Sequence, residues 1–392
     1  MADASVLDPI ANLHKLTALN KVLTSKAAIA QTPKQLVWAL NKAKLYRYVP
    51  MVPEKQRHRI PLLLVFAVMN RPYILDLRPG HSYVEFMLKK GYDLYLLDWG
   101  APGPEDKNMS FGDYVLEYLP RAIRKLKAVS KVEEFSMLGW CIGAIIATSY
   151  AALRPDDGLR NLILLTAPLD FSDKEAITFA RWTAEPNFDV DKVLQTFGNM
   201  PAEMIEYGAK ALKPVENYVG NFLRLWDNID DPKVVEAWHA MNTWVTDNIP
   251  MAGATFRQLV VDLYRNDRLM KGEWELRGER VDVGKIRANL LTVIAEGDHI
   301  TPPCQSRTIM GKVASKDKEA VQRSRRPHWH HGRQRRGQGH LAAPGQLAGP
   351  AVQVTPAGHA AKSVFQNGSV PPTSVSATSI RISARRSCNR PS

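Results

Sequence analysis

One stretch, residues 133–153, constrains the fold most, because its pattern predicts a strand, a sharp turn and a helix in direct succession. An apolar run ends in GWCIG at 139–143, and small and aliphatic residues then recur at helical spacing. This is the G-x-S-x-G pattern of a nucleophile elbow with Cys141 in place of serine. Glycines suit a strained turn, and the next helix N-terminus favours a thiolate and a developing oxyanion. The alternative is a buried structural cysteine at an ordinary strand–helix junction.

The rest of the chain supplies the strands and helices that such an elbow needs. Continuous apolar runs, typical of strands buried on both faces, lie at 60–69 (IPLLLVFAVM), 94–98 (LYLLD), 162–166 (LILLT) and 290–295 (LLTVIA). Helical patterns at 83–90 and 111–130 alternate with them. This alternation predicts an α/β-hydrolase fold with a mostly parallel sheet. It also places Cys141 at the carboxyl end of its strand, where such sheets carry catalytic groups.

The chain divides into five predicted segments. Residues 1–50 form an N-terminal helical arm of two amphipathic helices, the second starting at Thr32 and Pro33 as N-cap and first helical residue. Residues 51–169 and 286–319 form the two parts of the core, and residues 170–285, rich in helical patterns and aromatic side chains, form a helical cap inserted between them. Residues 320–392 form an aberrant, basic, low-complexity tail that we expect to be disordered.

Composition narrows the class of protein. Three cysteines in 392 residues argue against a disulfide framework and favour a reducing compartment. The first residues lack a basic region followed by an apolar core, and no apolar run approaches membrane-spanning length, so we expect a soluble, cytoplasmic protein without a signal peptide. The net charge of +13 comes mainly from residues 320–392, which hold eleven Lys and Arg but no Asp or Glu. The remaining chain is nearly neutral, which argues against specific nucleic-acid binding.

A candidate acid follows the last predicted strand. In hydrolases with this elbow the catalytic order along the chain is nucleophile, acid, histidine, and Asp298 lies in the turn where the acid belongs. The backbone N–H of Ile142 and one N–H from Asn70 or Arg71 are candidate oxyanion donors, because hydrolases of this fold place their donors there. No metal site is predicted, because the histidine-rich run at 328–331 has no partner cluster.

Several motifs together resemble one enzyme family. They are 69–77 (MNRPYILDL), 98–100 (DWG), the GWCIG elbow, 166–173 (TAPLDFSD), Trp244 with Asp247 and Pro250, and 298–303 (DHITPP). The combination resembles the polyhydroxyalkanoate synthases over about residues 5–319. The short N-terminal arm is similar to that of the small catalytic subunits of classes III and IV, closest to class IV.

The resemblance implies a cytoplasmic acyltransferase of polyhydroxyalkanoate, or poly(3-hydroxybutyrate), biosynthesis. It would transfer (R)-3-hydroxyacyl units from coenzyme A to a growing polyester held as a thioester on Cys141, and release coenzyme A. In this family a histidine deprotonates the cysteine, and Asp298, by matched position, supports activation of the incoming hydroxyl. No cofactor is expected beyond the acyl-coenzyme A substrate. Expected partners are the surface of polyester granules, a small accessory subunit and further copies of this chain in a homo-oligomer.

The catalytic histidine is where the chain departs from the family. It should lie in a Gly-Gly-His turn roughly thirty residues after Asp298, whereas residues 321–332 are VQRSRRPHWHHG. We predict no apolar strand before this segment and no amphipathic helix after it. If the chain acts as written, His328 is the candidate base, with His330 and His331 at similar chain distance. Otherwise the base is lost and the synthase is impaired by several orders of magnitude.

A shifted reading frame accounts for this tail. Codon degeneracy permits residues 322–328, read one nucleotide later, to give SVPGGH, and residues 327–341 to give HIGIMAGSGAAKVTW. The new histidine codon then starts inside that of Pro327. The lack of acidic residues after Glu319 is consistent with an unselected frame. We therefore interpret the C-terminus as frameshifted.

Two other functions fit parts of the pattern. One is a cysteine-nucleophile hydrolase of the dienelactone hydrolase type, which the long aromatic insertion and the NRPYILDL stretch disfavour. The other is a catalytically silent subunit that binds polyester granules. Release of coenzyme A together with polymer formation separates the three, because a hydrolase would release coenzyme A without polymer and a silent subunit would release none.

Overall fold

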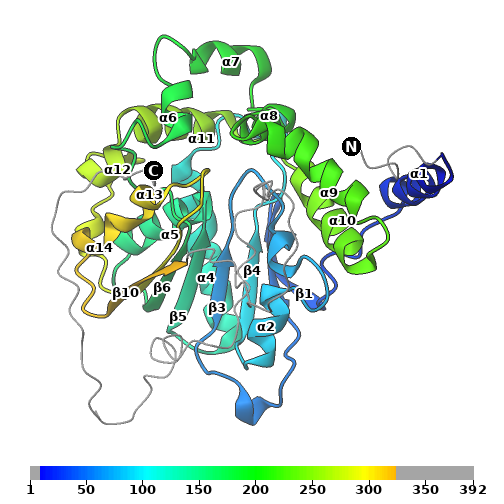
Figure 1. The fold of residues 1–392 in the computed structure, drawn as a ribbon. Helices are drawn as coiled ribbons and strands as arrows, with labels where there is room; N and C mark the ends of the chain where they lie inside the picture. Colours follow the sequence, from blue (N-terminus) through cyan, green and yellow to red (C-terminus); the bar gives the residue numbers. More distant parts are fainter. Residues whose placement is uncertain (1–8, 324–392) are drawn as a thin grey trace, which may run out of the picture.

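A central β-sheet organises the molecule (Figure 1). The computed structural model describes residues 9–323. In that range eight strands form one sheet in the order β1-β2-β4-β3-β5-β6-β9-β10. Their bounds are β1 Lys34–Leu40, β2 Ala43–Tyr48, β3 Leu62–Val65, β4 Leu94–Asp98, β5 Phe135–Trp140, β6 Leu159–Leu165, β9 Asn289–Ala295 and β10 Lys318–Arg323.

Parallel pairing dominates this sheet. β3 lies between β4 and β5 and is parallel to both, and the pairs β5–β6, β6–β9 and β9–β10 are parallel as well. The pairs β1–β2 and β2–β4 are antiparallel. All four residues of β3 are fully buried, as expected of a strand that is covered on both faces. The predicted α/β fold with a mostly parallel sheet is confirmed.

Helices connect the parallel strands. They are α2 Tyr83–Lys89, α3 Phe111–Asp113, the π-helical turn η5 Tyr114–Tyr118, α4 Leu119–Ser130 and α5 Ile142–Leu153. Helix α5 is buried along almost its whole length, so the elbow that precedes it stands on the enclosed core of the molecule. Within residues 9–323, no helix combines the length and the apolar character that crossing a membrane requires.

The N-terminal arm differs from the predicted pair of helices. Residues of α1 Pro9–Thr24 are helical, but the second predicted helix is wrong, because β1 and β2 form a hairpin there with Asn41 at φ 51° in its turn. Thr32 does not cap a helix. Its N–H and hydroxyl instead donate to the buried carboxylate of Asp76, at 3.0 and 2.7 Å. The hairpin is extended further by the pairing of β2 with β4, a distant contact that local periodicity does not reveal.

A helical insertion lies between β6 and β9. It consists of α6 Thr178–Trp182, α7 Val190–Phe197, α8 Ala202–Ala211, η6 Val215–Gly220, α9 Asn221–Asp227, α10 Pro232–Thr246, α11 Gly253–Gln258, η7 Leu259–Arg265 and α12 Arg268–Lys271. These helices fall inside the predicted range 170–285, which also contains an unpredicted hairpin, β7 Glu275–Leu276 and β8 Glu279–Arg280. Figure 1 shows α6, α8 and α11 over one end of the sheet, with α9 and α10 extending toward α1. There Val22 packs with Leu225 and Trp238.

The last strand corrects a second prediction. The segment before the expected histidine does form a strand: β10 pairs in parallel with β9, from Lys318 beside Leu290 to Arg323 beside Ala295. Its sequence, KEAVQR, is too polar to predict a buried strand, but within the described sheet β10 has one neighbour, and an edge strand tolerates polar side chains. The predicted boundary at 319/320 therefore cuts through β10. The remaining tail, with its predicted disorder and His328, lies outside the described residues.

Candidate active site

Cys141 occupies the turn between β5 and α5. Its backbone is left-handed, with φ 55° and ψ −124°, a conformation that residues other than glycine rarely adopt. Two hydrogen bonds hold it there: the Cys141 N–H donates to the carbonyl of Leu165 on β6 (3.1 Å), and the Cys141 carbonyl accepts from the N–H of Ala144 (2.9 Å). The sharp strand–turn–helix elbow that GWCIG predicts is therefore present, and it presents a half-buried thiol at the carboxyl end of β5.

Both flanking glycines are needed because the backbone passes too close for a side chain. A Cβ on Gly143 would lie 2.2 Å from the carbonyl oxygen of Val65 and 2.6 Å from that of Phe66. A Cβ on Gly139 would lie 2.6 Å from the Cα of Ala144. The first contact locks the start of α5 against the end of β3, and the second locks the end of β5 against α5. The elbow is thus fixed by neighbouring backbone.

The thiol of Cys141 lies in a mixed environment. The N–H of Ile142 and the hydroxyl of Thr301 both act to lower the pKa of Cys141, and so favour the thiolate. Burial acts more strongly in the opposite direction, and with the nearby carboxylate of Asp298 it raises the pKa of Cys141 to about 12. The sequence led us to expect that the helix N-terminus would favour a thiolate, but in this conformation burial outweighs it. The sulfur is a neutral thiol near pH 7 and needs a base to become a nucleophile.

Asp298 lies in the turn after β9, near the thiol. One carboxylate oxygen, Oδ1, accepts the backbone N–H groups of Ile300 and Thr301, each at 2.9 Å. Burial still raises the pKa of Asp298 above its ordinary value, with these two donors opposing the rise. Strands β5 and β9 each pair in parallel with β6, so the turns that follow them lie together at the carboxyl ends of the strands. The structure therefore brings together two predicted site residues that are far apart in the sequence.

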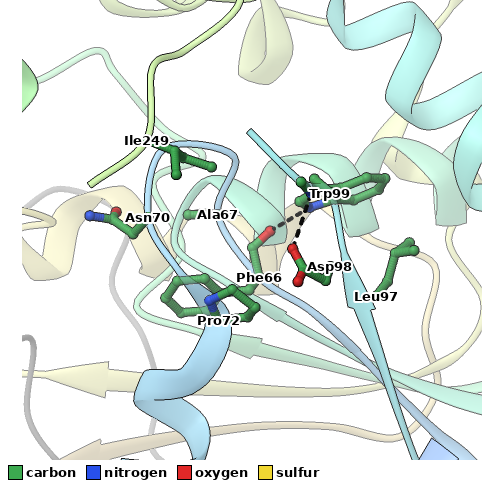
Figure 2. Close-up of a pocket in the computed structure, with 9 residues that line it drawn as sticks. Phe66, Ala67, Asn70, Pro72, Leu97, Asp98, Trp99 and Ile249 are labelled. Atoms are coloured by element: carbon green, nitrogen blue, oxygen red, sulfur yellow. Dashed lines mark hydrogen bonds between the residues drawn. The ribbon is translucent and has the colours of Figure 1, made fainter. Parts of the chain in front are cut away.

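Asn70 and Arg71 follow β3, and their described contacts are with the helical insertion. The amide of Asn70 donates to the side chain of Asn248. Arg71 pairs with Asp247, with Nε and Oδ1 3.5 Å apart, and its carbonyl accepts from the indole N–H of Trp244 at 2.8 Å. Figure 2 shows the Asn70 amide pointing away from Trp99 and Asp98. None of these contacts reaches Cys141, so the second oxyanion donor stays a prediction. The N–H of Ile142 acts to lower the pKa of Cys141, but its role as an oxyanion donor is a prediction as well.

Three of the sequence motifs meet around the loop that follows β3, which carries Phe66, Asn70 and Arg71. The indole N–H of Trp99 donates to the carbonyl of Phe66 at 3.0 Å (Figure 2). Gly100 turns the chain away from β4 with φ 75°, and its N–H donates to Asp98 at 3.0 Å. The hydroxyl of Tyr73 donates to Asp247 at 3.0 Å. The NRPY, DWG and Trp244–Asp247 motifs thus support one another at the loop that lies against the elbow.

Three residues near the site were not singled out from the sequence. Thr301 belongs to the 298–303 motif; its N–H donates to Asp298, and its hydroxyl acts to lower the pKa of Cys141. Tyr264 belongs to the aromatic-rich insertion and stands in the π-helical turn η7. Its ring meets that of Phe171 edge-on with centroids 4.8 Å apart, and burial and nearby Cys141 raise its pKa. His299 has a buried Nε2 without a hydrogen-bond partner in the described part of the chain. Turn position alone could have indicated Thr301 and His299, whereas Tyr264 comes from a distant segment.

Residues 79–331 match the family model for the alpha/beta hydrolase fold, and residues 11–87 match that for the poly-beta-hydroxybutyrate polymerase (PhaC) N-terminus. The poly(3-hydroxyalkanoate) polymerase subunit PhaC of Allochromatium vinosum is 34% identical over 286 residues, which are 73% of this chain and 79% of that protein. This chain belongs to the PhaC family. Synechocystis PhaC is 32% identical over 76% of this chain and 78% of its own length. The recognised resemblance to polyhydroxyalkanoate synthases is therefore confirmed at the level of the family.

Other PhaC proteins are longer. The PhaC subunit of Haloferax mediterranei is 34% identical over 76% of this chain, but the match spans only 60% of that protein. Among solved structures, epoxide hydrolase A from Mycobacterium thermoresistibile is 16% identical, with a TM-score of 0.45 over 76% of this chain and 93% of its own. Within residues 9–323 of this PhaC chain, no three His, Cys, Asp or Glu side chains gather as metal ligands would.

Proposed function

We propose that this chain is a polyhydroxyalkanoate synthase, an acyltransferase that moves (R)-3-hydroxyacyl units from coenzyme A onto a polyester held on Cys141. The observation that carries the proposal is a cysteine in the left-handed elbow of a PhaC chain, with the carboxylate of Asp298 nearby. A thioester substrate and an acyl-cysteine have similar free energies, so the acyl group remains active for a further transfer. A serine ester would be a poorer acyl donor.

The proposed chemistry has two steps. First, a base takes the proton of Cys141, Sγ attacks the thioester carbonyl, and the C–S bond to coenzyme A breaks, so that coenzyme A leaves with a proton. The N–H of Ile142 and an N–H from Asn70 or Arg71 stabilise the oxyanion. Second, the 3-hydroxyl of another unit, activated with the help of Asp298, loses its proton and attacks the carbonyl of the acyl-cysteine. The C–S bond breaks, and the sulfur takes up a proton, which restores the Cys141 thiol. Each cycle lengthens the polyester by one ester bond.

The base is the missing part of this proposal. β10 ends at Arg323, beside the end of β9, and Asp298 lies three residues after Ala295, which pairs with Arg323. We therefore expect a histidine soon after β10 to lie at the carboxyl ends of the strands, as Asp298 does. His328 holds that chain position as written, whereas the shifted frame would place a Gly-Gly-His there. We propose that the tail is out of frame and that the chain as written is impaired; sequencing the source DNA across codons 319–327 tests this, and an intact frame there without a homopolymer slip would refute it.

The remaining parts of the proposal follow from the family. The substrate would be an (R)-3-hydroxyacyl-coenzyme A, with no separate cofactor. The protein would act in the cytoplasm at the surface of polyester granules, as a homo-oligomer with a small accessory subunit of the class III or IV type. These partners are proposals for this chain, because it spans only 60% and 64% of the haloarchaeal PhaC proteins to which it is similar.

The test measures coenzyme A release and polymer together, for the chain as written and for a version with the restored frame. In the restored enzyme we expect Cys141→Ala to lower activity by about 1,000-fold or more, because the nucleophile is lost. Cys304→Ala is the matched control, since Cys304 stands on α13 Pro303–Arg307, outside the elbow, and should keep near-normal activity. Undiminished polymer from Cys141→Ala would refute the proposal. Coenzyme A release without polymer would favour a hydrolase, and no release by the restored enzyme would favour a silent granule-binding subunit.

A further inference from the structure

Main-chain contacts join the loop after β3 to the helical insertion. Asn70 and Asn248 form an isolated antiparallel bridge. The N–H of Ile249 donates to the carbonyl of Met69 at 3.1 Å, so in this bridge the N–H and C=O groups of Asn70 itself point away from the partner segment. The trans peptide unit between Met69 and Asn70 agrees with this, because its C=O and N–H point in opposite directions. The Asn70 N–H is therefore directed away from the insertion.

Trp244 holds a second carbonyl of the same loop. It stands near the end of α10, and its indole N–H donates to the carbonyl of Arg71 at 2.8 Å. In an antiparallel bridge of this kind the N–H of Arg71 faces the partner segment. Among the hydrogen bonds of residues 9–323, none is donated by the N–H of Asn70. Of the two predicted donors in this loop, Asn70 is therefore the one whose N–H is available.

The other end of the loop contacts the elbow. The ring of Phe66 meets that of Trp140, the residue before Cys141, edge-on with centroids 5.3 Å apart. The start of α5 lies against the same part of the loop, because a Cβ on Gly143 would be 2.6 Å from the carbonyl oxygen of Phe66. Strands β3 and β5 are parallel neighbours, so the loop and the elbow follow adjacent strand ends. The loop thus connects the insertion to the nucleophile.

The direction of each peptide unit in this loop matters for acyl transfer. An oxyanion is stabilised by N–H groups that are already in place, and it is repelled by carbonyl oxygens. A loop can present either kind of group, depending on how its peptide units are turned. The insertion holds the carbonyls of Met69 and Arg71 on its own side, which leaves the N–H of Asn70 for the opposite side.

We propose that the helical insertion completes the oxyanion site, with the N–H of Asn70 as the second donor and Trp244 as a positioning residue. The proposal rests on the proposed function, because the oxyanion forms when the acyl group is transferred to or from Cys141. Trp244 does not touch the substrate; it acts by fixing the peptide units around Asn70. A purely structural role is the alternative, in which Trp244 only packs the insertion onto the core.

Steady-state kinetics of the restored enzyme with (R)-3-hydroxybutyryl-coenzyme A test the positioning. Trp244→Phe keeps an aromatic ring and removes the indole donor. We expect kcat to fall about tenfold or more, with KM within about twofold, because an oxyanion contact acts in the transition state. Trp238→Phe is the matched control: Trp238 stands on the same helix, and its indole N–H also donates to a main-chain carbonyl, that of Asn221 at 3.1 Å. It should keep kcat within about twofold.

A substrate analogue with sulfur in place of the carbonyl oxygen separates the two roles. A thiocarbonyl accepts hydrogen bonds more weakly than a carbonyl, so its reaction depends less on the oxyanion donors. We expect Trp244→Phe to lower kcat for the analogue clearly less than kcat for the oxygen substrate. An equal fall for both substrates, an equal fall in Trp238→Phe, or a raised KM with unchanged kcat would each overturn the proposal. Thermal unfolding curves establish that both variants are folded.

Hydrogen–deuterium exchange tests the hold on the loop without requiring activity. Exchange is followed by mass spectrometry on peptides that cover residues 66–73 of the full chain. We expect it to be about tenfold faster in Trp244→Phe and unchanged in Trp238→Phe, because local opening becomes easier when a hydrogen bond of that loop is lost. An unchanged rate in Trp244→Phe would overturn the proposal. Failure of the proposed function would be distinct, since Cys141→Ala would then still form polymer while the exchange result stood.

Discussion

The two turns that form the site are built differently. Both follow parallel strands that flank β6, one after β5 and the other after β9. The turn after β5 is held by backbone: Cys141 is left-handed, and Gly143 lies against the carbonyl of Val65. The turn after β9 is held by a side chain, since the carboxylate of Asp298 accepts two N–H groups of its own turn. The turn after β5 is part of the packed core, whereas the turn after β9 is a polar loop that packs against this core.

This difference predicts how each turn responds to substitution. A change in the first turn must move β3 or α5, so stability and activity should fall together. A change in the second turn removes buried polar groups whose charged forms are poorly solvated, so activity should fall while stability is kept or increases. Functional polar residues that are costly to bury are therefore expected in the second turn, after β9. The predictions below separate the two turns by these opposite outcomes.

The largest expected effect is that of Gly143→Ala. The added Cβ would lie 2.2 Å from a main-chain oxygen of β3, a contact that only a shift of backbone can relieve. We expect a loss of about 3 kcal/mol or more in the free energy of unfolding, or failure to fold, together with loss of activity. Chemical denaturation followed by circular dichroism measures this loss.

Gly311→Ala is the control for that substitution. Gly311 lies in α14 Ile309–Lys312, and a Cβ there would have no neighbour within 4 Å. The control should be neutral or slightly stabilising, because alanine favours the helix over glycine. If Gly143→Ala were as stable as Gly311→Ala, the first turn would not be fixed by packing and the contrast between the two turns would be wrong.

The second effect is that of Asp298→Asn. Its amide oxygen can still accept the two N–H groups, but the buried charge is gone. Because burial raises the pKa of Asp298 in the folded state above its unfolded value, the ionised group destabilises the fold at pH values above that raised pKa. We expect activity to be lost and Tm at pH 7 to rise by a few degrees. The gain should shrink as the pH falls through the raised folded-state pKa and vanish below about 3, where the carboxyl is protonated in both states.

Asp76→Asn should have the opposite sign. The carboxylate of Asp76 accepts the N–H and hydroxyl of Thr32 and the hydroxyl of Ser82, so both of its oxygens are used. An asparagine there would aim an N–H₂ group at one of these donors. We expect about 1–3 kcal/mol of destabilisation. A lower Tm for both variants would show that Asp298 is a structural carboxylate like Asp76, against the proposed distinction.

Local patterns in the sequence predicted the parts of the site that are made locally. The elbow was found because close backbone approaches require glycine at positions 139 and 143, and the acid because it directly follows a strand. The hairpin β1–β2 was missed because Thr32 and Pro33 imitate a helix start, while the pairing of β2 with β4 is a distant contact. β10 was missed because a strand with one partner needs no apolar run.

The environment of the thiol could not be predicted in the same way. Its pKa depends on burial and on groups from a distant segment, Asp298 and Thr301 in the turn after β9. The sequence pattern indicates a helix N-terminus beside Cys141, but not how strongly burial acts on the thiol. Because burial dominates, the elbow alone does not make a reactive thiolate. In the proposed mechanism, the base must therefore remove a proton from a buried thiol, which the motif alone does not indicate.

The smallest expected effect concerns His299, the neighbour of Asp298 in the second turn. Burial lowers the pKa of His299, Lys213 lowers it further, and Glu216 partly opposes them. The unfolded chain therefore binds a proton at about pH 6.5, where the folded protein does not yet bind one. Stability contributed by neutral His299 is present above that pH and falls as the pH drops toward the lowered folded-state pKa.

His299→Phe removes this titration while keeping a ring in the turn. Between about pH 7 and about pH 5, the Tm of the variant should fall less than that of the unchanged protein. The Tm of the variant minus that of the unchanged protein should therefore increase as the pH falls. At about pH 8, where both proteins lack the proton, the difference reports packing alone and serves as the internal control. Parallel curves across the whole range would show that His299 titrates as it does in the unfolded chain. The burial of polar groups would then be confined to Asp298 instead of being a property of the whole turn after β9.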